Sequence, residues 1–140
     1  AKKMAESKGI PLILSDGPPG IGCPVISAVS GTGLAVIVTE PTPSGIHDLR
    51  RVVELCQHFS VPMAVIINKS DLNSIKADEI HSFCEDNGLL IVGELPHDTM
   101  FVDALVRGLA ITEFSNGYAS QQLRTAWSKI LNLLALPEVA

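Results

Sequence analysis

Four short apolar runs recur along the chain, separated by longer segments in which apolar residues follow helical spacing. The runs are Ile10–Leu14, Leu34–Val38, Met63–Ile67 and Leu89–Val92. They are rich in Val, Ile and Leu and do not alternate with polar residues, which is typical of strands buried on both faces of a parallel sheet. The pattern therefore predicts four strands, the first of them preceded by a helix that Gly9 ends.

The segments between the runs predict amphipathic helices. Apolar residues recur there at i, i+3, i+4 and i+7, which is the spacing of one helix face. Gly88 suits a left-handed residue just beyond the second of these helices. The apolar positions of three helices are Leu49, Val52, Val53 and Cys56; Ile80, Phe83 and Cys84; and Leu123, Trp127, Ile130 and Leu134.

The alternation of strand and helix predicts a three-layer α/β/α fold with a mainly parallel sheet. Residues 1–140 contain no internal repeat and no long linker, so we expect them to belong to one domain. Four strands are few for a sheet with helices on both faces, and a helix already precedes the first strand. We therefore expect the sheet to be incomplete, with further strands upstream.

Composition excludes several classes of protein. Hydrophobic residues make up 46% of the chain and charged residues 18%, so a substantial core can form. The net charge is −5 and no basic stripe is present, which argues against nucleic acid as a partner. No apolar run approaches the roughly 18 residues that span a bilayer. The three cysteines form no CxxC pair, so we expect no disulfide framework, zinc site or complete iron–sulfur site within this chain, and a cytoplasmic location.

The segment after the first predicted strand carries the clearest chemistry. It reads SDGPPGIGCP from Ser15 to Pro24. An Asp directly after a buried strand is the Walker-B arrangement, in which Asp16 would hold Mg²⁺ through a coordinated water. The glycines let backbone N–H groups approach an anion. The alternative is a tight strand-to-helix turn with a solvated Asp.

This string resembles the DGPPG segment of MinD/Mrp-type deviant-Walker P-loop ATPases, and DGPPGIGCPVI is most similar to members that carry an inserted ferredoxin domain. The resemblance implies ATP and Mg²⁺ as ligands and a P-loop NTPase-like fold. It makes Asp16 the catalytic Walker-B residue and makes Gly17, Pro18, Pro19 and Gly20 the γ-phosphate-sensing segment. It gives Cys23 no role in binding a cluster.

The next two strand ends match the same family. Glu40 lies in a VTEPT segment that resembles a nucleotide-facing loop of the family, and we expect Ser44 to cap the helix that follows. The third strand runs into Asn68, Lys69 and Asp71, an NKxD motif that reads guanine in GTPases. The resemblance instead implies that Asn68 contacts adenine. An Asx-type turn that caps the next helix is the alternative.

The fourth strand leads to Pro96 and Asp98 in a segment that resembles GxIPxD of the family, where the backbone around the Pro–Asp pair packs on adenine. The alternative for Asp98 is an ordinary helix N-cap. His97 is expected to be a surface loop residue.

A phosphate-binding loop with Lys and Ser/Thr is absent from the sequence, so this segment alone is not expected to hydrolyse ATP or to hold a cofactor. By resemblance, the parent protein would carry 4Fe–4S clusters in a ferredoxin region outside this chain. It would act with an iron–sulfur or redox partner protein.

Three other functions remain open. A GTPase would use Asn68 and Asp71 on guanine. A receiver-like signalling domain would use Asp16, Thr39 and Lys69 at successive strand ends. A plain interaction domain is the third, and in any of these cases an exposed sheet edge predicts self-association as a dimer or larger oligomer.

Overall fold

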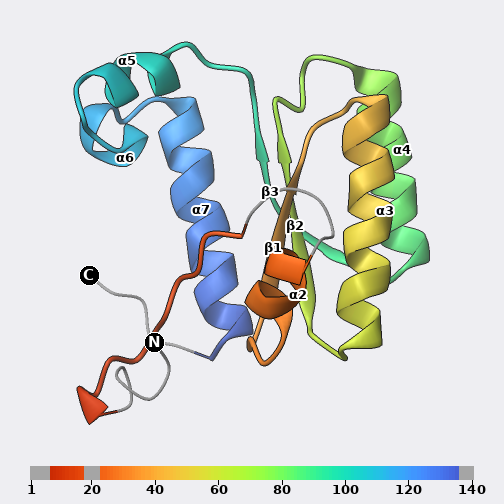
Figure 1. Ribbon diagram of the computed structural model, residues 1–140. Helices are drawn as coiled ribbons and strands as arrows, with labels where there is room; N and C mark the ends of the chain where they lie inside the picture. The colour runs from red at the N-terminus through yellow and green to blue at the C-terminus, as the bar shows by residue number, and fades with distance from the viewer. Residues whose placement is uncertain (1–6, 18–22, 136–140) are drawn as a thin grey trace.

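A computed structural model describes residues 7–17 and 23–135 (Figure 1). Within them, three parallel strands form a sheet in the order β1-β2-β3. The strands are β1 (Ala35–Thr39), β2 (Met63–Asn68) and β3 (Leu90–Leu95). Each coincides with one of the last three predicted strands, and both strand pairs are parallel, as expected.

Helices cover both faces of this sheet. In Figure 1, α3 and α4 lie on one side of the strands and α7 lies on the other. The predicted three-layer α/β/α fold is therefore confirmed. The helices are α2 (Cys23–Val29), α3 (Pro43–His58), α4 (Ser74–Asp86), α5 (Met100–Val106), α6 (Ile111–Phe114) and α7 (Tyr118–Leu133).

The central strand β2 shows how the sequence builds these layers. Val65 and Ile67 join the core beneath α3 and α4, whereas Ala64 and Ile66 join the core beneath α7. Successive side chains of a strand point to opposite faces, so a continuous apolar run supplies both cores. At Gly93 of β3, a Cβ would lie 2.7 Å from the Cβ of Ala126, which shows how closely α7 packs on the sheet.

The first predicted strand differs from the structure. Residues 10–17 form no strand, and Figure 1 draws them as an irregular trace outside the sheet. Leu14 is 81% exposed, and Ile10 and Ile13 are also exposed. A strand requires a neighbour that accepts and donates its backbone hydrogen bonds, and no described strand lies beside this segment. The prediction of four paired strands is therefore wrong for these described residues.

The start of α3 also differs from the prediction. Thr42, not Ser44, is the N-cap, and its Oγ1 accepts a hydrogen bond from the N–H of Gly45 at 3.0 Å. Pro43 has no N–H to satisfy and suits the first helical position, so the helix begins before Ser44. At the end of α4, Gly88 has φ +62°, which confirms the expected left-handed residue beyond that helix.

Candidate functional site at the carboxyl ends of the strands

The polar residues predicted at the strand ends meet at one edge of the sheet. The strands are parallel, and after one register shift between β2 and β3 their last residues still align, so Thr39 lies beside Ile67 and Asn68 lies beside Leu95. The loops after all three strands therefore leave the sheet together, near the top of Figure 1. In open α/β folds, this edge is the usual place for a ligand.

Glu40 joins the first two loops. One of its carboxylate oxygens, Oε1, lies 2.8 Å from Lys69 Nζ and 3.4 Å from Asn68 Nδ2. The Glu40 and Lys69 side chains are 37% and 39% exposed, so the ion pair stabilises the fold by about 1 kcal/mol at most. Its main effect is to hold these three side chains in one place.

Lys69 has an unusual backbone conformation. Its φ is +52°, in the left-handed region that residues other than glycine rarely adopt. This conformation costs roughly 1–2 kcal/mol. Strained residues of this kind concentrate at functional sites, where the surrounding structure holds them in place. The position of Lys69 directly after β2 therefore supports a functional reading of this strand end.

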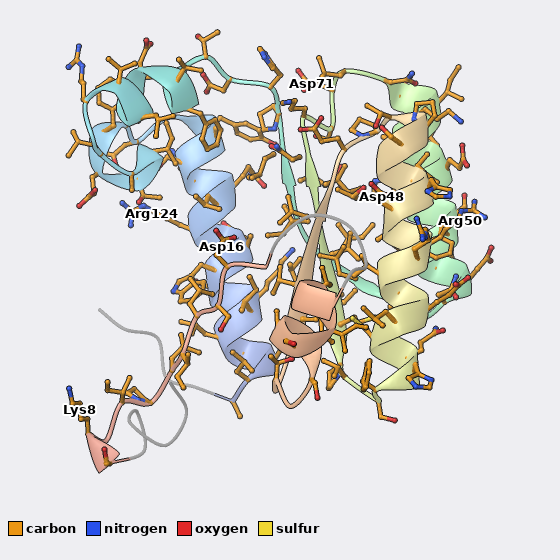
Figure 2. The ribbon with its side chains drawn as sticks, viewed as in Figure 1. Lys8, Asp16, Asp48, Arg50, Asp71 and Arg124 are labelled. Carbon is orange, nitrogen blue, oxygen red and sulfur yellow. The ribbon has the colours of Figure 1, made fainter. Side chains whose placement is uncertain are left out.

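Asp71 joins the second loop to the third. Its Oδ1 accepts a hydrogen bond of 2.6 Å from the backbone N–H of His97, and the N–H of Ser70 donates to the Leu95 carbonyl at 3.0 Å. Figure 2 shows Asp71 at the end of the sheet where the strands finish. The helix cap that the Asx-turn alternative requires is supplied by Asn73, which accepts from the N–H of Lys76. Asp71 is thus a tether between loops in this structure.

Pro96, His97 and Asp98 form the loop that leaves β3. Pro96 and Asp98 are half-buried and His97 is exposed, as predicted for a surface loop residue. Asp98 Oδ1 accepts from the N–H of Met100 at 2.9 Å, although the N-cap residue itself is Thr99. The carboxylate of Asp98 therefore stabilises the first turn of α5. This role is similar to the helix N-cap that was the alternative for Asp98, although Asp98 lies one residue before the N-cap.

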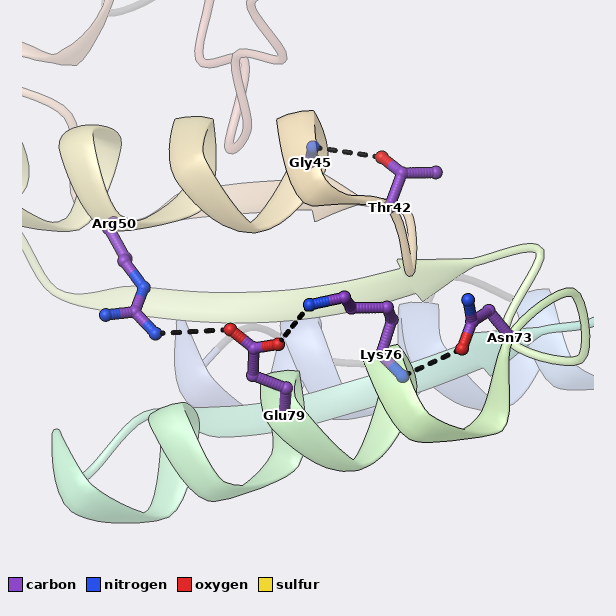
Figure 3. Close-up of polar contacts among 6 residues, drawn as sticks. All are labelled: Thr42, Gly45, Arg50, Asn73, Lys76 and Glu79. Carbon is purple, nitrogen blue, oxygen red and sulfur yellow. Dashed lines mark hydrogen bonds and ion pairs between the residues drawn. The ribbon is translucent and has the colours of Figure 1, made fainter.

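Gly45 is a site residue that sequence reasoning missed. A Cβ at this position would lie 2.3 Å from the carbonyl oxygen of Glu40, which is a severe overlap. Figure 3 shows the hydrogen bond that brings the N–H of Gly45 to Thr42. The signal was present as a Gly three residues after a capping Thr, although such a glycine is also common in turns.

Asp16 lines a cleft of about 720 Å³ that Glu40 also lines. Ser15, Gly17 and Thr39 are also among the residues that line this cleft. Asp16 is exposed and makes no hydrogen bond or ion pair with other described residues. Of the predicted γ-phosphate-sensing segment, Pro18, Pro19 and Gly20 lie outside the described residues.

The donor set fits a weakly held, largely hydrated ion. Among residues 7–17 and 23–135, no group of three or more His, Cys, Asp or Glu residues could enclose a metal. Mg²⁺ usually keeps several waters and binds through one or two carboxylates together with substrate phosphates. A single exposed carboxylate at Asp16 is compatible with that mode, and an all-protein metal cage is not available in the described part.

The receiver-like alternative finds little support in this geometry. It requires a free hydroxyl at Thr39 and a free ammonium at Lys69. Thr39 is buried, and its Oγ1 donates to the carbonyl of Gly45 at 3.0 Å. The ammonium of Lys69 is paired with Glu40. Both groups are thus already used inside the fold.

Comparison with solved structures defines the class of fold. MinD of Aquifex aeolicus superposes with a TM-score of 0.79 at 23% identity, over 99% of this chain and 59% of that one. The cell division ATPase MinD of Pyrococcus furiosus gives 0.70 at 15% identity, over 84% and 50%. A ParA family ATPase from Chlorobium tepidum gives 0.61 at 21% identity, over 79% and 46%. The chain therefore has the fold of the MinD- and ParA-type P-loop ATPases.

Sequence comparison agrees with this class. No protein-family model matches the chain. The cytosolic Fe-S cluster assembly factor Nubp1 homolog of Drosophila melanogaster is 27% identical in an alignment that covers 86% of this chain and 45% of the relative. Uncharacterized protein MJ0578 of Methanocaldococcus jannaschii is 41% identical over 75 residues, which cover 54% and 26%. The predicted resemblance to MinD/Mrp-type ATPases is confirmed.

The chain spans less than half the length of these curated relatives. Within the part of the chain that the structure describes, every helix is too short or too polar to cross a membrane.

Proposed function

We propose that this chain is the Walker-B and base-binding part of a MinD-like ATPase that binds Mg-ATP. The observation that carries the proposal is the meeting of Glu40, Asn68 and Lys69 at the carboxyl ends of parallel strands, in a MinD-type fold. Asp16 lines the cleft that Glu40 also lines, so a nucleotide at the strand ends would bring its phosphates and Mg²⁺ towards Asp16.

Several of the predicted residues would contact the nucleotide or its metal ion in this proposal. Asp16 would hold Mg²⁺ through water, and Gly17 with residues 18–20 would follow the γ-phosphate. Asn68 would contact the adenine edge, while Pro96 and the backbone near Asp98 would pack on the ring. Bound Mg²⁺ would neutralise charge on the phosphates during hydrolysis. The chain's own residues would position the nucleotide and aim the metal.

The wider process is also a proposal. Some relatives are named as cytosolic Fe-S cluster assembly factors, and the string DGPPGIGCPVI resembles that of ATPases with an inserted ferredoxin domain. We propose that the parent protein couples ATP hydrolysis to iron–sulfur or electron-transfer chemistry in the cytoplasm. Its 4Fe–4S clusters would lie outside this chain, and a redox protein would be its partner.

Nucleotide binding to the full-length parent tests the function. Mg-ATP should bind the wild type, and Asp16→Asn should abolish the Mg²⁺ dependence of that binding. Asp78→Asn is the matched control, because Asp78 is an exposed carboxylate on α4 outside the strand-end loops. Isothermal titration with and without Mg²⁺ measures both. Equal Mg²⁺ dependence in wild type and Asp16→Asn would remove Asp16 from the site.

The isolated 140-residue chain provides a second test. Its sequence has no Gly-rich loop with Lys and Ser/Thr, so it should show no ATP hydrolysis above a protein-free blank. Measurable ATP hydrolysis that co-purifies with the chain would contradict the proposal that hydrolysis requires a phosphate-binding loop outside it.

A GTPase remains the second candidate, favoured by the NKxD motif alone. Guanine recognition by this motif uses the Asp as well as the Asn, and one oxygen of Asp71 is already engaged by the backbone of His97. Competition between ATP and GTP for the full-length protein separates the two candidates. A clear preference for GTP would favour the GTPase.

A further inference from the structure

The carboxylate of Glu40 controls which way the amide of Asn68 can face. An ionised carboxylate accepts hydrogen bonds and cannot donate them. The group of Asn68 that turns towards Glu40 Oε1 is therefore Nδ2, at 3.4 Å. A flipped amide would direct Oδ1 at a carboxylate oxygen, and two acceptors would then face each other. The amide of Asn68 consequently has one favoured orientation.

The backbone of Glu40 is itself held firmly. Pro41 follows it and is buried, which keeps Glu40 extended. The carbonyl oxygen of Glu40 packs against Gly45 in the first turn of α3. Lys69 Nζ, at 2.8 Å, binds the same oxygen that Asn68 approaches. Glu40 is thus a fixed acceptor and not a mobile surface carboxylate.

We propose that Glu40 is a positioning residue that makes this site select a 6-aminopurine over a 6-oxopurine. The proposal rests on the proposed function, in which Asn68 meets the base. With Nδ2 turned towards Glu40, the Oδ1 of Asn68 is left as an acceptor for the ligand. An amino group at C6 of the purine donates to that oxygen. A carbonyl at C6 would present a second acceptor, and an unmatched polar pair in a binding site weakens binding.

The test compares ATP with inosine triphosphate on the full-length protein. The two nucleotides share the N7 acceptor and the phosphates and differ along one edge of the base, where inosine has a carbonyl at C6 and a proton on N1, so their affinity ratio reports on that edge. We expect the wild type to bind ATP about tenfold more tightly, the change that one unmatched hydrogen-bonding group produces. In Glu40→Gln, the new amide can donate to Asn68 Oδ1 and permit the flip. The ratio should then fall to within about twofold.

Lys69→Met is the matched control. It removes the ion pair to Glu40 while leaving the carboxylate to orient Asn68, and a methionine meets the same backbone strain as the lysine at φ +52°. This variant should keep the wild-type ratio of affinities for ATP and inosine triphosphate, even if it weakens the binding of both nucleotides equally. Thermal unfolding of each variant checks that it is folded. Glu40→Asp, which withdraws the carboxylate by one methylene, replaces Glu40→Gln if that variant does not fold.

The possible results distinguish a failure of the Glu40 proposal from a failure of the proposed function on which it rests. A wild type that binds neither nucleotide overturns the proposed function. A wild type that prefers ATP, with an unchanged ratio in the Glu40 variant, overturns the role of Glu40 and leaves the ATPase proposal intact. A wild type that prefers inosine triphosphate overturns the orientation argument and favours the GTPase. Loss of the ratio in the Glu40 variant with retention in Lys69→Met supports the inference.

Discussion

Position 45 leaves no room for a side chain. The loop after β1 turns back on the first turn of α3, and this turn brings the carbonyl oxygen of Glu40 to within 2.3 Å of where a Cβ would lie. The N–H of Gly45 is held at the same time by the capping hydroxyl of Thr42. A single hydrogen atom at this position therefore allows the Glu40 loop to take its shape.

We expect Gly45→Ala to destabilise the protein by roughly 1–3 kcal/mol, because the added methyl group must displace backbone. The fluorescence of Trp127, the only tryptophan of the chain, can follow unfolding in denaturant. Gly33→Ala is the control, since its Cβ would meet only the Leu134 side chain at an ordinary 3.7 Å. Equal unfolding midpoints for the two variants would show that the loop at Glu40 moves freely.

Residue types at the site could be predicted from the sequence, but their pairings could not. Glu40 and Asn68 each follow an apolar run, so their place at a strand end is visible in the sequence alone. Their contact depends on β1 lying directly beside β2, which is a property of the folded sheet. The same limit applies to Asp71, whose partner is a backbone N–H 26 residues further along the chain.

At the scale of elements, an ion-pair network joins α3 to α4. Glu79 on α4 lies 2.7 Å from Lys76 Nζ and 3.5 Å from Arg50 Nη2 on α3 (Figure 3). The hydrogen bond from Lys76, with the positive charges of Lys76 and Arg50, lowers the pKa of Glu79 below its usual value. The ionised form is therefore favoured in the folded protein.

This lowered pKa predicts an acid-dependent contribution of Glu79 to stability. The contribution should be complete above the usual glutamate range and should disappear as the pH falls through the lowered pKa of the folded state. Glu79→Gln should thus unfold slightly more easily than wild type at neutral pH and equally at strongly acidic pH. The measurement is the denaturant midpoint across pH, with exposed Glu54 of α3 changed to Gln as control. A difference in denaturant midpoint between wild type and Glu79→Gln that stays constant across pH would contradict this link between the pKa of Glu79 and stability.

The strands with neighbours were predicted well, and the apolar run without a neighbour was not, while the short helices α5 and α6 were not predicted. The runs at β1, β2 and β3 are apolar and form a sheet, with bounds close to those predicted. The run Ile10–Leu14 is equally apolar yet forms no strand among the described residues. A strand forms only beside another strand that shares its backbone hydrogen bonds. An apolar run therefore shows that a segment can form a strand, but not that a neighbouring strand is present.

At the scale of the whole molecule, β1 is an edge strand of the sheet formed by the described residues, and apolar side chains lie near it. Val38 is 62% exposed and lines the cleft together with Ile13 and Leu14. Open edges with unpaired backbone groups bind other strands readily. Self-association, expected from the sequence, is still a prediction. The β1 edge is the surface through which we expect it to occur.

We expect the isolated chain to form a dimer or larger oligomer, and Val38→Lys to shift it towards monomer, because a charged residue on an edge strand opposes pairing. Light scattering after gel filtration measures the mass. Val102→Lys on α5 is the control, since Val102 is 61% exposed but does not line the cleft. A wild type that stays monomeric at all concentrations would count against the edge as an interface.

The strand order of the sheet has a consequence for how the protein is made. In the described sheet, β2 pairs with β1 and β3 pairs with β2, so each of these two strands pairs with the strand synthesised immediately before it, and one helix connects each pair. Neither β2 nor β3 has to wait for a partner that is distant in the sequence, so the contacts of this described sheet are short-range for a parallel fold. A chain emerging from the ribosome can build this part of its core one strand–helix unit at a time, with Glu40 in place before Asn68 arrives to meet it.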